Sequence, residues 1–129
     1  APIFAKGGKV HVPKPRDYGY RPPRKVRAGA LCHALSLFVK EGRVKVVDAW
    51  QVDAIKTRSV ASALDTLKST GSAVVVDAAT NESLRLSTRN LANATFLPPE
   101  GVNVYDLLRH DTLVLTQDAA RALEKRLSA

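Results

Sequence analysis

The residues best suited to chemistry are the cations at the start of the chain. Eight of the 20 Lys and Arg residues lie among the first 27 positions, where Asp17 is the single acid. Lys offers a point charge to phosphate, Arg a planar fork that binds phosphate or stacks on a base, and Tyr a ring face and a hydroxyl. This composition predicts RNA or DNA as the partner. The predicted contact residues are Lys6, Lys9, His11, Lys14, Arg16, Tyr18, Tyr20, Arg21, Arg24, Lys25 and Arg27.

The backbone of this segment is expected to be extended and irregular. Its prolines and glycines, Pro13, Pro15 and Gly19 among them, forbid a long helix and spoil a central strand. Fully extended, such a segment reaches about 70 Å. We call residues 1–23 the arm and residues 24–129 the body. Two other interpretations are a solvated basic tail without a specific partner and a module that binds an acidic protein.

Two carboxylates, Asp48 and Asp77, each follow a short β-branched run, and they suggest a different chemistry. If the two runs are neighbouring strands, the aspartates could hold Mg²⁺, and the chain would be a metal-dependent phosphoesterase acting on nucleic acid. The simpler interpretation is that each Asp ends its strand and turns the chain. Gly7-Gly8 fits neither a P-loop nor a dinucleotide fingerprint. We favour the simpler interpretation and predict that the chain is not an enzyme.

Histidine, cysteine and tryptophan add little to a catalytic interpretation. His11, His33 and His110 are far apart in sequence and Cys32 is alone, so the spacing expected of a metal site is missing. We predict no catalytic residue, no metal and no cofactor, and we expect His110 on the surface or facing RNA. Trp50 is expected to pack under its loop rather than to stack on a base.

Behind the arm, the apolar spacing alternates between helical and strand periods. Helices are predicted over 24–41, from an N-cap at Thr57 to a stop at Gly71, over 81–90, after a cap at Asn103, and after a cap at Thr116. Strands are predicted over 44–48, 73–77, 95–97 and 113–115. This alternation indicates an open α/β fold with a mostly parallel sheet covered on both faces.

The length of 129 residues suits one domain plus the arm, and no apolar run approaches the roughly twenty residues of a membrane span. Because Met is absent and the chain starts at Ala1, we expect an upstream portion to be missing.

Several motifs along the chain form a characteristic series, of which the most specific is Gly101-Val102-Asn103-Val104-Tyr105-Asp106-Leu107-Leu108. The others are Gly7-Gly8-Lys9, Pro13-Lys14-Pro15-Arg16-Asp17-Tyr18, the helix from Lys25 to Ser36, Val46-Val47-Asp48, Lys56-Thr57, Arg89-Asn90-Leu91 and Leu113-Val114-Leu115-Thr116. In this order, the motifs resemble the large-subunit ribosomal protein family called L four in its bacterial or organellar form. Lys9 and Val12 depart from the family, where many members have glycine.

The resemblance implies a structural constituent of the large ribosomal subunit that binds its rRNA and supports its assembly near the peptide exit tunnel. The arm would be the returning limb of the family's long loop, and the opening strand, first helix and most of that loop would be missing. The implied partners are large-subunit rRNA and neighbouring ribosomal proteins, without a membrane or self-association, in a cytoplasmic or organellar ribosome. Weaker RNA contacts on the body are expected from Arg58, Arg85, Arg89 and Asn90.

Overall fold

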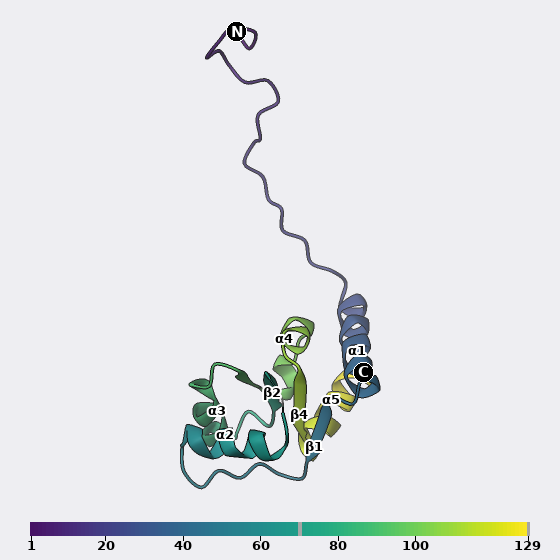
Figure 1. The fold of residues 1–129 in the computed structure, drawn as a ribbon. Helices are drawn as coiled ribbons and strands as arrows, with labels where there is room; N and C mark the ends of the chain where they lie inside the picture. Colours follow the sequence, from purple (N-terminus) through teal and green to yellow (C-terminus); the bar gives the residue numbers. More distant parts are fainter. Residues whose placement is uncertain (70, 129) are drawn as a thin grey trace.

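Four parallel strands form the centre of the protein, in a computed structural model that describes residues 1–69 and 71–128 (Figure 1). The strands are β1 (Val44–Val47), β2 (Ala73–Val76), β3 (Ala94–Leu97) and β4 (Thr112–Thr116). Their order across the sheet is β1-β4-β2-β3, so the last strand lies between the first and the second. All three strand pairs are parallel, which confirms the predicted α/β fold class.

Helices alternate with the strands as the apolar spacing predicts. They are α1 (Arg24–Lys40), α2 (Thr57–Thr66), α3 (Glu82–Arg89), α4 (Val104–Arg109) and α5 (Gln117–Ser128), with a 3₁₀ turn η1 (Pro99–Gly101). Asn81 and Asn103 cap α3 and α4, because their side-chain oxygens accept the N–H groups of Leu84 and Asp106. The cap predicted at Thr57 is wrong: Lys56 occupies that position, without a side-chain hydrogen bond.

The two faces of the sheet bury separate apolar clusters. Val74 and Val76 of β2 point to the face covered by α1, α4 and α5, where Phe38 and Leu107 are fully buried. Val75 points to the opposite face and packs with Val60 of α2 and Leu84 of α3. This alternation is the period-2 pattern of a central strand buried on both sides. The apolar spacing after Asn103 also predicts that Leu108 faces inward, but Leu108 is 57% exposed, because only one face of the short α4 reaches the core.

β1 is a half-buried edge strand rather than the mostly buried strand that its valines suggest. Val46 is 56% exposed, and β1 pairs only with β4. The Lys45 ammonium donates a hydrogen bond to the carbonyl of Leu67, at the end of α2. A cation at this position satisfies a free carbonyl of the helix terminus and opposes its partial negative charge.

Residues 1–23 contain neither helix nor strand, and in Figure 1 they lead away from the start of α1. Two turns order the first residues, in which the N–H groups of Phe4 and Gly7 donate to the carbonyls of Ala1 and Phe4 at 3.1 and 2.8 Å. The division of the chain into arm and body remains a prediction. Among the described residues, no helix is long and apolar enough to cross a membrane.

Candidate nucleic-acid interface

The cations of the arm are exposed and make no ion pair within the described parts of the chain. The ion pairs recorded there are Arg43–Glu41, Arg85–Glu82 and Arg121–Asp118, all in the body. The candidate side chains from Lys6 to Arg27 are all exposed. Their charge is therefore free to act on an external anion, and no internal ion pair has to be broken first.

Asp17, the acid of the arm, acts on the backbone rather than on the neighbouring cations. Its Oδ1 accepts the N–H of Gly19 at 2.7 Å, which forms a short Asx turn. A Cβ at position 19 would lie 2.9 Å from this oxygen, so the turn favours glycine there. The guanidinium of Arg16 meanwhile lies 3.8 Å from the centroid of the Tyr18 ring. Sequence reasoning missed this stacked pair, although the i, i+2 spacing in an extended chain was the available signal.

The first turn of α1 extends the positive surface of the arm into the body. Arg24, Lys25 and Arg27 are exposed there, the turn contains no acid, and Pro23 at the N-cap position offers no side-chain hydrogen bond. Positive side chains at the positive end of a helix are unfavourable unless an anion faces them. The arrangement is therefore consistent with a phosphate partner at this end of α1.

The weaker candidates on the body lie on the other face of the sheet. Arg58 is in α2, whereas Arg85, Arg89 and Asn90 belong to α3 and its C-cap, and all four are exposed. Figure 1 shows α2 and α3 on the side of the sheet away from α1. The Arg85 guanidinium is also paired with Glu82 at 2.7 Å. The structure thus separates these residues from the arm.

The strand order contradicts the assumption behind a metal site at Asp48 and Asp77. β4 lies between their strands, so the two aspartates do not end neighbouring strands. Both oxygens of Asp77 are occupied: Oδ1 accepts the Ala78 N–H at 2.8 Å and the Thr116 hydroxyl at 2.9 Å, and Oδ2 accepts the Asn81 amide at 2.8 Å. Asp48 instead accepts the Gln117 amide at 2.5 Å. Asp77, only 8% exposed, ties β2 to α3 and to the cap of α5.

No cluster of three or more His, Cys, Asp or Glu side chains that could hold a metal occurs within residues 1–69 and 71–128. His110, expected on the surface, is 5% exposed. Its Nδ1 lies 2.7 Å from the carbonyl oxygen of Asp106 and its Nε2 lies 3.0 Å from the Thr95 hydroxyl. The expectation failed because a residue beside a turn can still point inward from the end of a short helix.

Asp111, the neighbour of His110, fixes the entry into β4. Its Oδ2 accepts the N–H and the hydroxyl of Ser72, each at 3.2 Å. These hydrogen bonds, the first of them above all, hold the pKa of the Asp111 carboxyl below its usual value, because they favour the charged form. Arg43 and His110 lower this pKa further. The role of Asp111 is to join the loop before β2 to the start of β4.

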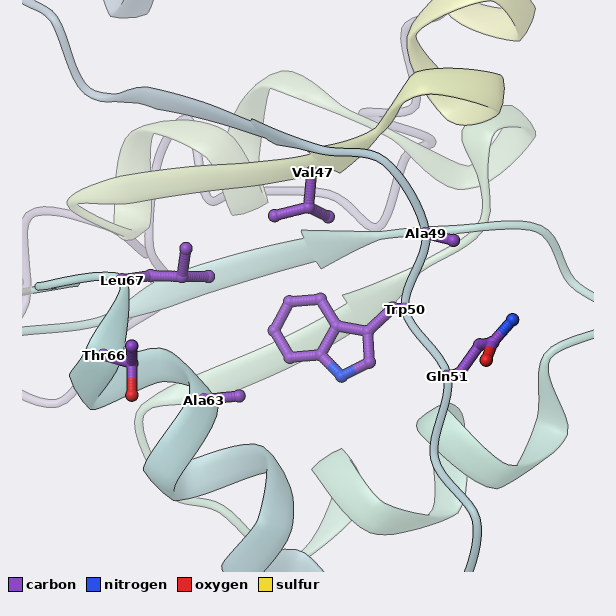
Figure 2. A pocket seen from close by; sticks show the side chains of 7 residues that line it. All are labelled: Val47, Ala49, Trp50, Gln51, Ala63, Thr66 and Leu67. Carbon is purple, nitrogen blue, oxygen red and sulfur yellow. The ribbon is translucent and has the colours of Figure 1, made fainter.

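Trp50 lines a hollow of about 410 Å³ between β1 and α2 (Figure 2). The other lining residues are Val47, Ala49, Gln51, Ala63, Thr66 and Leu67. The indole packs against the cluster around Val60, and the Trp50 carbonyl accepts the Asn81 amide at 2.9 Å. None of these side chains is charged, so the hollow offers no cation to a phosphate group. The prediction that Trp50 packs under its loop is confirmed.

A strip of exposed cations gathered in one segment is typical of proteins that contact nucleic acid. The Ribosomal protein L4/L1 family matches residues 1–126 of this chain. Similar proteins include the Large ribosomal subunit protein uL4 of Anaeromyxobacter dehalogenans (strain 2CP-C), 50% identical over 122 residues that cover 95% of this chain and 59% of that protein. The Large ribosomal subunit protein uL4 of Myxococcus xanthus is 48% identical over 95% of this chain, and that of Moorella thermoacetica is 41% identical over 99% of it.

This chain belongs to the Ribosomal protein L4/L1 family, as its motifs indicated. It spans 59% to 62% of the length of these three relatives.

Proposed function

We propose that this chain is a structural constituent of the large ribosomal subunit that binds large-subunit rRNA through its arm and supports assembly of the subunit. The observation that carries the proposal is the set of exposed cations between Lys6 and Arg27, which make no ion pair within the described residues. Membership of the family and the relatives' name, Large ribosomal subunit protein, support the same function. The cytoplasmic ribosome is the proposed location.

In this function the body acts as a mount and the arm as the contact surface. Flexible cations gain binding free energy mainly by releasing counterions from phosphate, so their number sets the salt dependence of binding. The prolines restrict the arm before it binds, which reduces the entropy lost on binding. The α2–α3 face, with Arg58 and Arg89, is the proposed place of weaker contacts with rRNA or with neighbouring ribosomal proteins.

The phosphoesterase alternative is not supported. The strands that precede Asp48 and Asp77 are separated by β4. Both carboxylate oxygens of Asp77 already accept hydrogen bonds, from Ala78, Asn81 and Thr116. Such contacts are typical of a residue that stabilises a strand end and a helix start. Family membership also favours a structural role over an enzymatic one.

The first experiment compares binding of the chain to the 5′ part of large-subunit rRNA and to an unrelated structured RNA of equal length, across a salt series. A preference for the rRNA that persists at physiological salt is expected, with a slope that reports about five to eight phosphate contacts. Equal, weak and steeply salt-sensitive binding to both RNAs would contradict the proposal.

A pair of charge variants tests whether the arm is the contact surface. The arm variant replaces by Gln three cations of the arm and the first cation of α1, namely Lys14, Arg16, Arg21 and Arg24. The control variant replaces four exposed cations of the body by Gln, namely Lys40, Lys56, Arg109 and Lys125. Both lose the same net charge. We expect the arm variant to lower the salt slope by about three, since each phosphate contact contributes roughly 0.7 to 0.9, and the control to change it by less than one. Equal effects would reject the arm as the main contact.

A further inference from the structure

Residues 13–20 of the arm alternate between two kinds of residue. Even positions carry side chains proposed to contact nucleic acid, Lys14, Arg16, Tyr18 and Tyr20. Odd positions carry residues that fix the backbone, Pro13, Pro15, Asp17 and Gly19. In an extended chain, residues two apart project to the same side. The contact of Arg16 with Tyr18 shows that these two side chains do meet on one side.

The same contact constrains the direction of the Tyr18 ring. A guanidinium that comes from two residues earlier and lies 3.8 Å from the ring centroid covers the face toward the start of the chain. The opposite face of the Tyr18 ring is not covered by Arg16, so it is available to a further flat group. Tyr18 and Tyr20 are 71% and 84% exposed, so neither ring is used by the body.

The spacing between the two tyrosines suits one further flat group. Two residues of extended chain span about 7 Å. Stacked bases in a nucleic-acid strand are about 3.4 Å apart, so about 7 Å accommodates one base between two rings. The Gly19 N–H donates a 2.7 Å hydrogen bond to Asp17 Oδ1, which orders the backbone around Tyr18.

We propose that Tyr18 and Tyr20 hold one unpaired RNA base between their rings, with Arg16 stacked on the outer face of Tyr18 and Lys14 on an adjacent phosphate. The inference rests on the proposed function, since it names the kind of RNA site that the arm recognises: a bulged or looped-out base rather than a continuous duplex. A base in a duplex is already stacked on its neighbours, whereas a bulged base offers both faces. Purines, with the larger ring area, are preferred.

The test uses two RNA hairpins that differ only by one bulged adenine, and it measures the affinity of the full chain for each. For the unaltered chain we expect about tenfold tighter binding to the bulged hairpin, as one stacked base provides. The ratio of the two affinities, bulged over paired hairpin, should fall to a value between about one and three in Tyr18→Leu and in Tyr20→Leu. Both variants should bind the paired hairpin as the unaltered chain does. Tyr18→Phe should keep the ratio, and Arg16→Lys, which retains the charge but loses the planar group, should lower it about threefold.

Tyr105→Leu is the matched control, because Tyr105 is a 72% exposed tyrosine on α4. It should leave the ratio at its original value. If the unaltered chain binds both hairpins equally, the stacking site is rejected while RNA binding by the arm stands. If it binds neither, the stacking site is rejected as well, and the proposed function is tested separately by the rRNA experiment above. If Tyr18→Leu weakens binding to both hairpins by the same factor, the ring does not read an unpaired base, and the inference is overturned.

Discussion

Replacing Asp77 is the sharpest test of whether this carboxylate is structural or catalytic. The side chain is 8% exposed and accepts three hydrogen bonds, from the Ala78 N–H, the Asn81 amide and the Thr116 hydroxyl. In Asp77→Asn one oxygen becomes an NH₂ group. That group would face a donor, either the Asn81 amide or the pair formed by Ala78 and Thr116. Asn81 cannot turn its oxygen toward position 77 without losing the cap of α3.

The expected loss of stability follows from these contacts. A hydrogen bond to a charged group contributes about 1.5–3 kcal/mol, and a buried donor left without a partner costs about 1–3 kcal/mol. Asp77→Asn, which keeps the volume and one acceptor, should therefore lower the free energy of unfolding by about 2 kcal/mol. Asp77→Ala, which removes every acceptor, should lower it by about 4 kcal/mol. For a body of this size, about 4 °C of Tm corresponds to each kcal/mol, so the expected shifts are about 8 and 16 °C.

Thermal and urea unfolding, followed by circular dichroism, measure these losses. Asp48→Asn is the matched control, because Asp48 is exposed and accepts only the Gln117 amide. It should change the free energy of unfolding by less than about 0.5 kcal/mol. RNA affinity should be unchanged in both Asn variants once they are folded. An Asp77→Asn variant with the original Tm would refute the structural interpretation of this network.

Three further changes test the body. Phe38→Ala should lower the free energy of unfolding by about 3–5 kcal/mol, because this fully buried ring fills the α1 face of the core; urea unfolding measures this, and a loss below 1 kcal/mol would contradict the packing. Asn103→Ala should cost about 1 kcal/mol in urea unfolding through loss of the α4 cap, whereas Asn103→Ser, which keeps a capping oxygen without placing a second carboxylate beside Asp106, should retain most of the stability. The lowered pKa of Asp111 stabilises the fold above its unfolded value of 3.8, and this contribution is lost as the pH falls through the folded pKa. Asp111→Asn should therefore lower Tm at pH 6. The difference in Tm between the unaltered chain and this variant, measured by thermal unfolding, should shrink as the pH falls below about 4. A difference in Tm that is the same at every pH would reject this explanation.

The elements of the body could be predicted from sequence because their signals are local. Asn81 and Asn103 precede helical spacing, and the runs around Val75 and Val114 are too short and too β-branched for helices. Each signal lies within a few residues of the element that it marks. The alternation of the elements then fixed the parallel α/β class.

What could not be predicted depends on contacts between distant segments. The strand order places β4 beside β1 and β2, which no local pattern encodes, and so it removed the supposed proximity of Asp48 and Asp77. The buried His110, just after α4, contacts the hydroxyl of Thr95 in β3, which is 15 residues away in sequence. The exposure of Val46 follows from the edge position of β1 rather than from its own residue type. In the candidate interface, the charges were evident from sequence, whereas the contact between Arg16 and Tyr18 needed the backbone.

The central position of β4 also has a consequence for the order in which the protein folds. β1 has no partner other than β4, and β2 reaches β1 only through it. During synthesis, residues 44–47 therefore wait unpaired until residues 112–116 have been made, whereas β2 and β3 can pair earlier. Local contacts form quickly and such a long-range pairing forms slowly. The arm is complete long before the sheet closes, so the surface proposed to bind RNA is available while the body is still unfinished.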